Sequence, residues 1–136
     1  MPIDIRGLAP LIQVFDMPTS VRFYRDILGF SVVASSPALS ENPDDVNWAM
    51  LRHDQIEFML NTAYEPESRP PAPEAGRFAG HRDTCLYFGC PDVDAAYRFL
   101  RGKGLDIREP KIAPYGMKQL YVNDPDGYLV CFQWTA

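Results

Sequence analysis

The sequence predicts an α+β fold made of two tandem βαβββ modules, whose curved mixed sheets surround a cleft. Three observations support this prediction: an internal repeat of about 75 residues, the same order of strand-like and helix-like segments in both halves, and a proline-rich connector between the halves. We therefore expect residues 1–136 to form a single domain, with the first module over about residues 8–61, the connector over 62–82 and the second module over about 83–134.

Each copy of the repeat begins with a short apolar run that ends in an aspartate. Asp16 and Asp92 hold this position, and each is predicted to cap a helix by accepting hydrogen bonds from its first free N–H groups. Gly29 and Gly104 are predicted to end the two helices with a left-handed cap. Between cap and glycine, residues recur at helical spacing: Val21, Tyr24 and Leu28 in the first half, and Ala96, Phe99, Leu100 and Lys103 in the second.

Three strand-like segments follow each predicted helix. They cover residues 30–34, 46–52 and 55–61 in the first half, and residues 105–109, 118–122 and 128–134 in the second. The sequence Asp124-Pro125-Asp126-Gly127 predicts a hairpin turn between the last two, because Asp-Gly tolerates a positive φ. The connector is predicted to be exposed.

Composition narrows the range of partners. The formal net charge of −5 disfavours nucleic acid, whose phosphates would be repelled, and favours a cationic small molecule. No apolar run approaches the roughly 18 residues that cross a bilayer, and residues 1–6 lack the basic region and apolar stretch of a signal peptide. We expect a cytoplasmic protein that binds neither nucleic acid nor membrane.

Strand periodicity predicts which side chains line the cleft. Side chains alternate between the two faces of a strand, so one face of each predicted sheet is apolar throughout and the other is mixed. A mixed, partly apolar wall is typical of a small-molecule site, and aromatic residues in nearby segments can complete it. The predicted ligand-binding residues are Gln13, Trp48, Glu57, Met59, Tyr87, Tyr115, Cys131 and Gln133.

The paired modules and three motifs resemble the vicinal-oxygen-chelate superfamily. The motifs are Phe23-Tyr24-Arg25-Asp26 with Leu28-Gly29-Phe30, Pro91-Asp92-Val93-Asp94, and Asp124-Pro125-Asp126-Gly127-Tyr128. The resemblance implies the glyoxalase/bleomycin-resistance fold, which is shared by isomerases, extradiol dioxygenases, fosfomycin-modifying transferases and drug-sequestering proteins. It also implies a twofold homodimer in which modules from two chains complete the cleft.

The resemblance further indicates where a metal would be bound. The positions that carry ligands in metal-using relatives hold Ala9, Cys85 and Cys131 here, with Glu57 at the fourth. Ala9 offers no lone pair, and a hard divalent cation prefers oxygen and imidazole ligands to two thiols. We predict no metal and no other cofactor. A soft-metal site at Cys85, Cys131 and Glu57, a reactive thiol pair, and two buried structural cysteines remain open alternatives.

Two functions follow from these observations. The first is a metal-independent small-molecule binding protein of the bleomycin-resistance-like branch, which sequesters an apolar or cationic compound. The second is a glyoxalase- or dioxygenase-like lyase, isomerase or oxygenase with an altered site, in which Glu57 is the candidate catalytic base. A regulatory module without any ligand is a third possibility.

Overall fold

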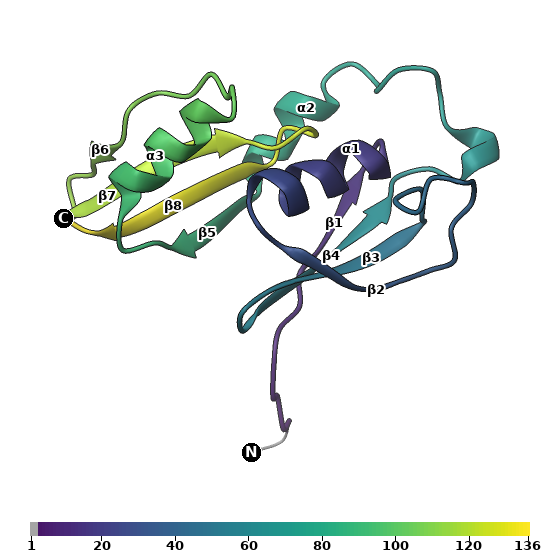
Figure 1. Cartoon of the computed structure of the whole chain (residues 1–136), viewed down its shortest axis with the longest axis horizontal. Coiled ribbons are helices and arrows are strands. Elements are labelled where there is room, and N and C mark those ends of the chain that lie inside the picture. Colours follow the sequence, from purple (N-terminus) through teal and green to yellow (C-terminus); the bar gives the residue numbers. More distant parts are fainter. Residues whose placement is uncertain (1–2) are drawn as a thin grey trace. The chain divides into compact units, whose positions relative to one another are not determined.

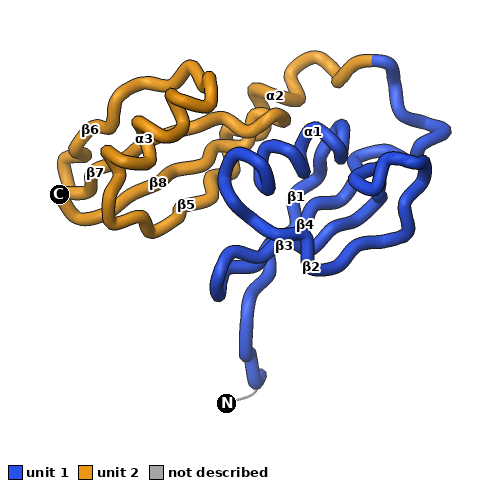
Figure 2. Tube along the Cα trace, viewed as in Figure 1, with its two compact units in different colours: residues 1–71 blue, residues 72–136 orange. Residues whose placement is uncertain are grey.

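We describe residues 3–136 of a computed structural model of the chain. The chain divides into two compact units, residues 1–71 and 72–136, which are coloured separately in Figure 2 and described one at a time below. Each unit contains one mixed four-stranded sheet, so the predicted tandem α+β architecture is confirmed. Among the described residues, no helix has the length and apolar character needed to span a membrane.

The first unit builds its sheet in the strand order β1-β4-β3-β2 (Figure 1). Strand β1 is parallel to β4, and the other neighbouring strands are antiparallel. The elements are β1 (Leu11–Val14), α1 (Met17–Val21), the π-helical turn η1 (Arg22–Ile27), β2 (Ser31–Ser35), β3 (Trp48–His53), β4 (Ile56–Thr62) and the 3-10 turn η2 (Pro66–Ser68).

The helical segment of the first unit begins and ends as the sequence predicts. The Asp16 carboxylate accepts a hydrogen bond from the Thr19 backbone N–H at 3.3 Å, and Gly29 has a φ of 91°. Tyr24 is fully buried, with its ring centroid 5.0 Å from that of Phe58 on β4. Because Phe58 lies on the face of β4 that the helix covers, this contact joins the helix to the sheet.

The second unit repeats the arrangement, with strand order β5-β8-β7-β6 and the same parallel pairing between its first and last strands. In Figure 1 the helix α3 lies over this sheet. The elements are α2 (Arg77–Gly80), the 3-10 turn η3 (His81–Asp83), β5 (Cys85–Gly89), α3 (Val93–Gly102), β6 (Lys111–Ile112), β7 (Met117–Asn123) and β8 (Leu129–Thr135). The caps are again those predicted: Asp92 accepts from the Ala95 N–H at 2.9 Å, and Gly104 has a φ of 92°.

Two sequence-based predictions for the second unit are wrong. The expected strand over residues 105–109 does not form, and only Lys111 and Ile112 pair with β7 before the chain leaves the sheet. Pro110 has no N–H to donate to a ladder, which is consistent with pairing that starts only after it. Phe99 was expected on the buried helical stripe but is 54% exposed, because α3 buries Val93 and Leu100 instead.

The connector is largely exposed, as predicted, but its second half is folded against the turn between β7 and β8. The His81 Nδ1–H donates to the Asp126 carbonyl at 2.7 Å, and the His81 ring stacks on Tyr128 with centroids 4.0 Å apart. Arg77 forms an ion pair with the nearly buried Asp126 carboxylate at 3.2 Å. The predicted Asp-Pro-Asp-Gly turn is therefore a docking point for residues 77–83 as well as a hairpin.

Candidate functional site

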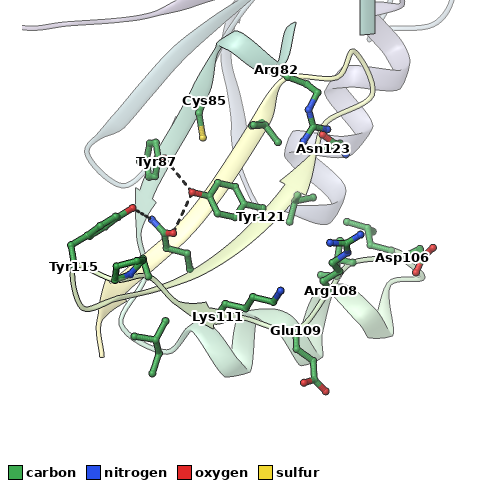
Figure 3. Close-up of a pocket in the computed structure, with 18 residues that line it drawn as sticks. Arg82, Cys85, Tyr87, Asp106, Arg108, Glu109, Lys111, Tyr115, Tyr121 and Asn123 are labelled. Carbon is green, nitrogen blue, oxygen red and sulfur yellow. Dashed lines mark hydrogen bonds between the residues drawn. The ribbon is translucent and has the colours of Figure 1, made fainter. Parts of the chain in front are cut away.

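A concavity of about 1150 Å³ lies on the open face of the second sheet (Figure 3). Its floor consists of side chains from β5 and β7, among them Cys85, Tyr87, Gln119 and Tyr121. Residues 105–109, which lie outside the sheet, and residues 111–114 form the opposite wall. Strand alternation explains the floor, because the neighbours of these residues in β7, such as the buried Leu120, point to the face covered by α3.

Hydrogen bonds connect the polar side chains of the floor. The Gln119 amide donates to the Tyr115 hydroxyl at 2.7 Å and to the Gln133 side-chain carbonyl at 2.9 Å. The Tyr121 hydroxyl donates to the Gln119 carbonyl oxygen at 3.3 Å and lies 3.3 Å from the Tyr87 hydroxyl. Gln119, at the centre of the network, is only 7% exposed. Its hydrogen bonds therefore hold the exposed tyrosine rings in place.

One hydroxyl proton of this network remains available to a ligand. The Tyr121 hydroxyl contacts both the Gln119 carbonyl oxygen and the Tyr87 hydroxyl, and either phenol can donate in the second contact. The Tyr115 hydroxyl accepts from Gln119, which leaves its own proton unused. Tyr115 is 69% exposed and is therefore the donor that the floor presents to a ligand carrying a hydrogen-bond acceptor.

The thiols beneath and beside the tyrosines are held in the protonated form. Cys131 is fully buried between Tyr87 and Tyr121, its neighbours on the adjacent strands. Burial, followed by the nearby Cys85, raises the Cys131 pKa to about 11, and burial also raises the pKa of Cys85. The Tyr121 hydroxyl also has a raised pKa, chiefly because of its hydrogen bond with Tyr87. The raised pKa values keep the Cys85 and Cys131 thiols protonated at pH 7.

The sequence-predicted ligand residues fall in both units. Tyr87 and Tyr115 line the concavity, Gln133 belongs to the hydrogen-bond network, and Cys131 lies between the tyrosine strands. The others belong to the first unit, where Gln13 is exposed and Trp48 and Met59 are half-buried, each on a sheet strand: Gln13 on β1, Trp48 on β3, Met59 on β4.

Glu57, the candidate catalytic base, is occupied by a neighbour within the first unit. Its carboxylate accepts two hydrogen bonds from the Arg52 guanidinium, at 2.7 and 3.0 Å. Arg52 is its direct partner across the β3–β4 ladder. The Glu57 carboxylate is therefore part of a partly exposed surface ion pair.

Several lining residues were missing from the predicted set. Gln119 could have been found by applying strand alternation to residues 118–122, because it faces away from Leu120. Arg108 could not, because residues 105–109 were expected to form a regular strand, and Lys111 lay outside every predicted element. Arg82 comes from the folded end of the connector, whose docking on the β7–β8 turn depends on contacts distant in sequence.

The residues at the expected metal positions do not fit a metal. Ala9 has no donor atom, and Cys85 and Cys131 have raised thiol pKa values, whereas metal ligation requires thiolates. Within residues 3–136, no group of three or more His, Cys, Asp or Glu side chains is arranged to hold a metal ion. We therefore derive no chemistry from a metal.

Comparisons with known proteins agree with the fold described above. The model of the Glyoxalase/Bleomycin resistance protein/Dioxygenase superfamily matches residues 8–132. Virulence protein STM3117 of Salmonella typhimurium (strain LT2) is 29% identical over 127 residues, which cover 88% of this chain and 77% of that protein.

Solved structures share the fold at lower identity. TnmS3, an antibiotic binding protein from Streptomyces sp. CB03234, has a TM-score of 0.65 and 22% identity, with 98% of this chain and 100% of TnmS3 covered. A lactoylglutathione lyase from Agrobacterium tumefaciens has a TM-score of 0.67 and 16% identity, with 96% and 94% covered. A binding protein and an enzyme thus share this fold. Because the family model spans nearly all of both modules, the chain belongs to the glyoxalase/bleomycin resistance protein/dioxygenase superfamily.

Proposed function

We propose that this protein binds a small organic molecule, without a metal, in the concavity of its second unit and holds it without converting it. The observation that carries the proposal is the hydrogen-bonded tyrosine floor, which presents the Tyr115 hydroxyl inside a concavity of about 1150 Å³. Small-molecule sites combine mostly apolar or aromatic walls with a few oriented polar groups, and this floor has that composition.

Three further observations support binding over catalysis. The thiols of the floor are protonated at neutral pH, Glu57 is held by Arg52, and the metal positions of the family lack suitable donors. The fold is shared with TnmS3, which is an antibiotic binding protein, and sequestration of an aromatic compound would need no reactive group. The fold is also shared with a lactoylglutathione lyase, so the preference for binding rests on the side chains of this chain.

The proposal is tested with two neutral fluorescent naphthalenes. N-phenyl-1-naphthylamine has an aromatic body without a carbonyl, whereas 6-propionyl-2-dimethylaminonaphthalene carries one. We expect saturable binding of both, at one site per chain. Tyr115→Ala should weaken both by about tenfold, which is typical of losing an aromatic contact and one hydrogen bond. Tyr115→Phe should weaken only the carbonyl compound, by about threefold or more.

Phe99→Ala serves as the matched control, because Phe99 is an exposed aromatic residue on α3 and does not line the concavity. It should leave both affinities unchanged. Non-saturable binding, or equal affinities in wild type and Tyr115→Ala, would contradict the proposal.

Elemental analysis of protein purified without chelator, with thermal shifts on adding Mn, Fe, Ni and Zn, tests metal independence. About one bound metal per chain with clear stabilisation would refute it.

We extend the proposal to the setting in which the protein acts. A cytoplasmic protein that binds neither nucleic acid nor membrane is expected from the sequence, and a twofold homodimer is expected from the family resemblance. Sedimentation equilibrium over a range of concentrations checks the assembly, and a mass corresponding to one chain throughout would remove the dimer from the proposal.

A further inference from the structure

We propose that the concavity of the second unit selects aromatic molecules that carry an acidic group, and that Arg82, Arg108 and Lys111 hold that group. The inference rests on the small-molecule binding proposed above and specifies the charge of the ligand. It differs from the expectation of a cationic ligand, which came from the net charge of −5 for the whole chain.

The charged side chains around the concavity differ in whether they form ion pairs. Its lining includes the three cations and two carboxylates, Asp106 and Glu109. Asp106 forms an ion pair with Arg101, which does not line the concavity, and the distance between the Arg101 nitrogen and the Asp106 oxygen is 3.6 Å. Arg82, Arg108 and Lys111 form no ion pair with any residue in the described range 3–136. The local excess of positive charge is therefore unpartnered.

The positions of the side chains separate two ends of the concavity. In Figure 3, Tyr87, Tyr115 and Tyr121 gather at one end, and Arg82 and Arg108 lie toward the other. The carboxylates of Asp106 and Glu109 point to the outside, away from the tyrosines. A ligand whose aromatic ring lies against the tyrosines thus has its other end near the cationic side chains.

Local charges outweigh the net charge of the chain in this setting. At physiological ionic strength the Debye length is about 8 Å, so distant acidic residues are largely screened. The three cations of the lining outnumber its two carboxylates, so the charge closest to a bound ligand is positive. Guanidinium groups also suit planar acids, because they bind carboxylate-like oxygens in pairs and stack on aromatic rings.

The test compares two probes that share one aromatic body. 8-Anilino-1-naphthalenesulfonate differs from N-phenyl-1-naphthylamine by a sulfonate group. We expect the sulfonate to bind about tenfold tighter at low salt, equivalent to about 1.4 kcal/mol. The double variant Arg108→Gln/Lys111→Gln should abolish this preference, so that the two probes bind the variant with equal affinity. Sodium chloride at 0.5 M should reduce it in the wild type.

Arg98→Gln is the matched control. Arg98 is an exposed arginine on α3, outside the concavity, and it also forms no ion pair with a described residue. Arg98→Gln removes one positive charge outside the concavity. Because the sulfonate preference is assigned to the charges that line the concavity, this variant should keep it. Lys111→Glu should reverse the preference towards a cationic naphthalene.

The possible outcomes separate this inference from the proposed function. Saturable, Tyr115-dependent binding of the neutral probe without a sulfonate preference would overturn the inference and leave the proposed function standing. The same holds if Arg98→Gln reduces the preference as much as the pocket substitutions do. If neither probe binds saturably to the folded wild-type protein, both proposals fail.

Discussion

The two units share one strand order and one pairing pattern, yet their open sheet faces carry different chemistry. In the first unit that face holds the Arg52–Glu57 ion pair, a surface contact between partners across the ladder. In the second, the corresponding face carries linked tyrosines and glutamines over a buried thiol, with a concavity beside them. A repeated backbone therefore fixes where side chains point, and the identity of a few alternate residues decides whether a face can bind a ligand.

The helices of the units differ as well, and this difference provides the largest expected effect. Phe23 and Phe99 occupy matching places in the repeat, but Phe23 is 7% exposed and Phe99 is 54% exposed. Phe23→Ala should lower the free energy of unfolding by about 3–5 kcal/mol, since it empties a buried site beside Tyr24. Phe99→Ala should change it by less than about 0.5 kcal/mol. Urea unfolding measures both, and equal losses would show that the helices pack alike.

The turn that anchors the connector gives the next largest effect. Gly127 has a φ of 87°, and a Cβ there would overlap the Phe78 carbonyl oxygen and lie 2.8 Å from its carbon. We expect Gly127→Ala to cost about 3 kcal/mol or more, combining backbone strain with displacement of the connector.

Gly116→Ala is the control for that turn, because Gly116 has a φ of 90° with no atom within 4 Å of the added Cβ. It should cost only the strain of a left-handed residue, about 1–2 kcal/mol. If the two variants unfold at the same urea concentration, close packing of Phe78 on the turn is not a source of stability.

The smallest effect distinguishes Cys131 from Glu57, which occupy corresponding expected ligand positions in the two units. The folded-state pKa of Cys131 is about 11, against an ordinary value of 9.0. The stabilisation from keeping this thiol neutral is therefore complete below about pH 9 and is lost as the pH rises to about 11.

The difference in unfolding free energy between wild type and Cys131→Ala should consequently shrink by about 2 kcal/mol between pH 8 and 11. Chemical denaturation under reducing conditions across this range measures it. Glu57→Gln should leave the pH dependence of the wild type unchanged over this interval, because it keeps the Cys131 thiol in place. A Cys131→Ala profile parallel to that of wild type would contradict the assigned pKa.

Local sequence signals determined much of the fold. Asp16 and Asp92 cap their helices, Gly29 and Gly104 end them, and the Asp124–Gly127 turn joins β7 to β8, because each depends on a few neighbouring residues. Strand alternation, which is also local, was enough to place Tyr87 and Cys131 on the face away from α3.

Tertiary structure decided the features that depend on contacts distant in sequence. The exposure of Phe99 follows from how α3 lies on its sheet, and the departure of residues 105–110 from the sheet follows from where pairing with β7 begins. Docking of residues 77–83 on the turn brings Arg82 into the lining of the concavity, which also includes Arg108 and Lys111. Periodicity describes one element at a time, whereas a pocket wall and its charge arise where several elements meet.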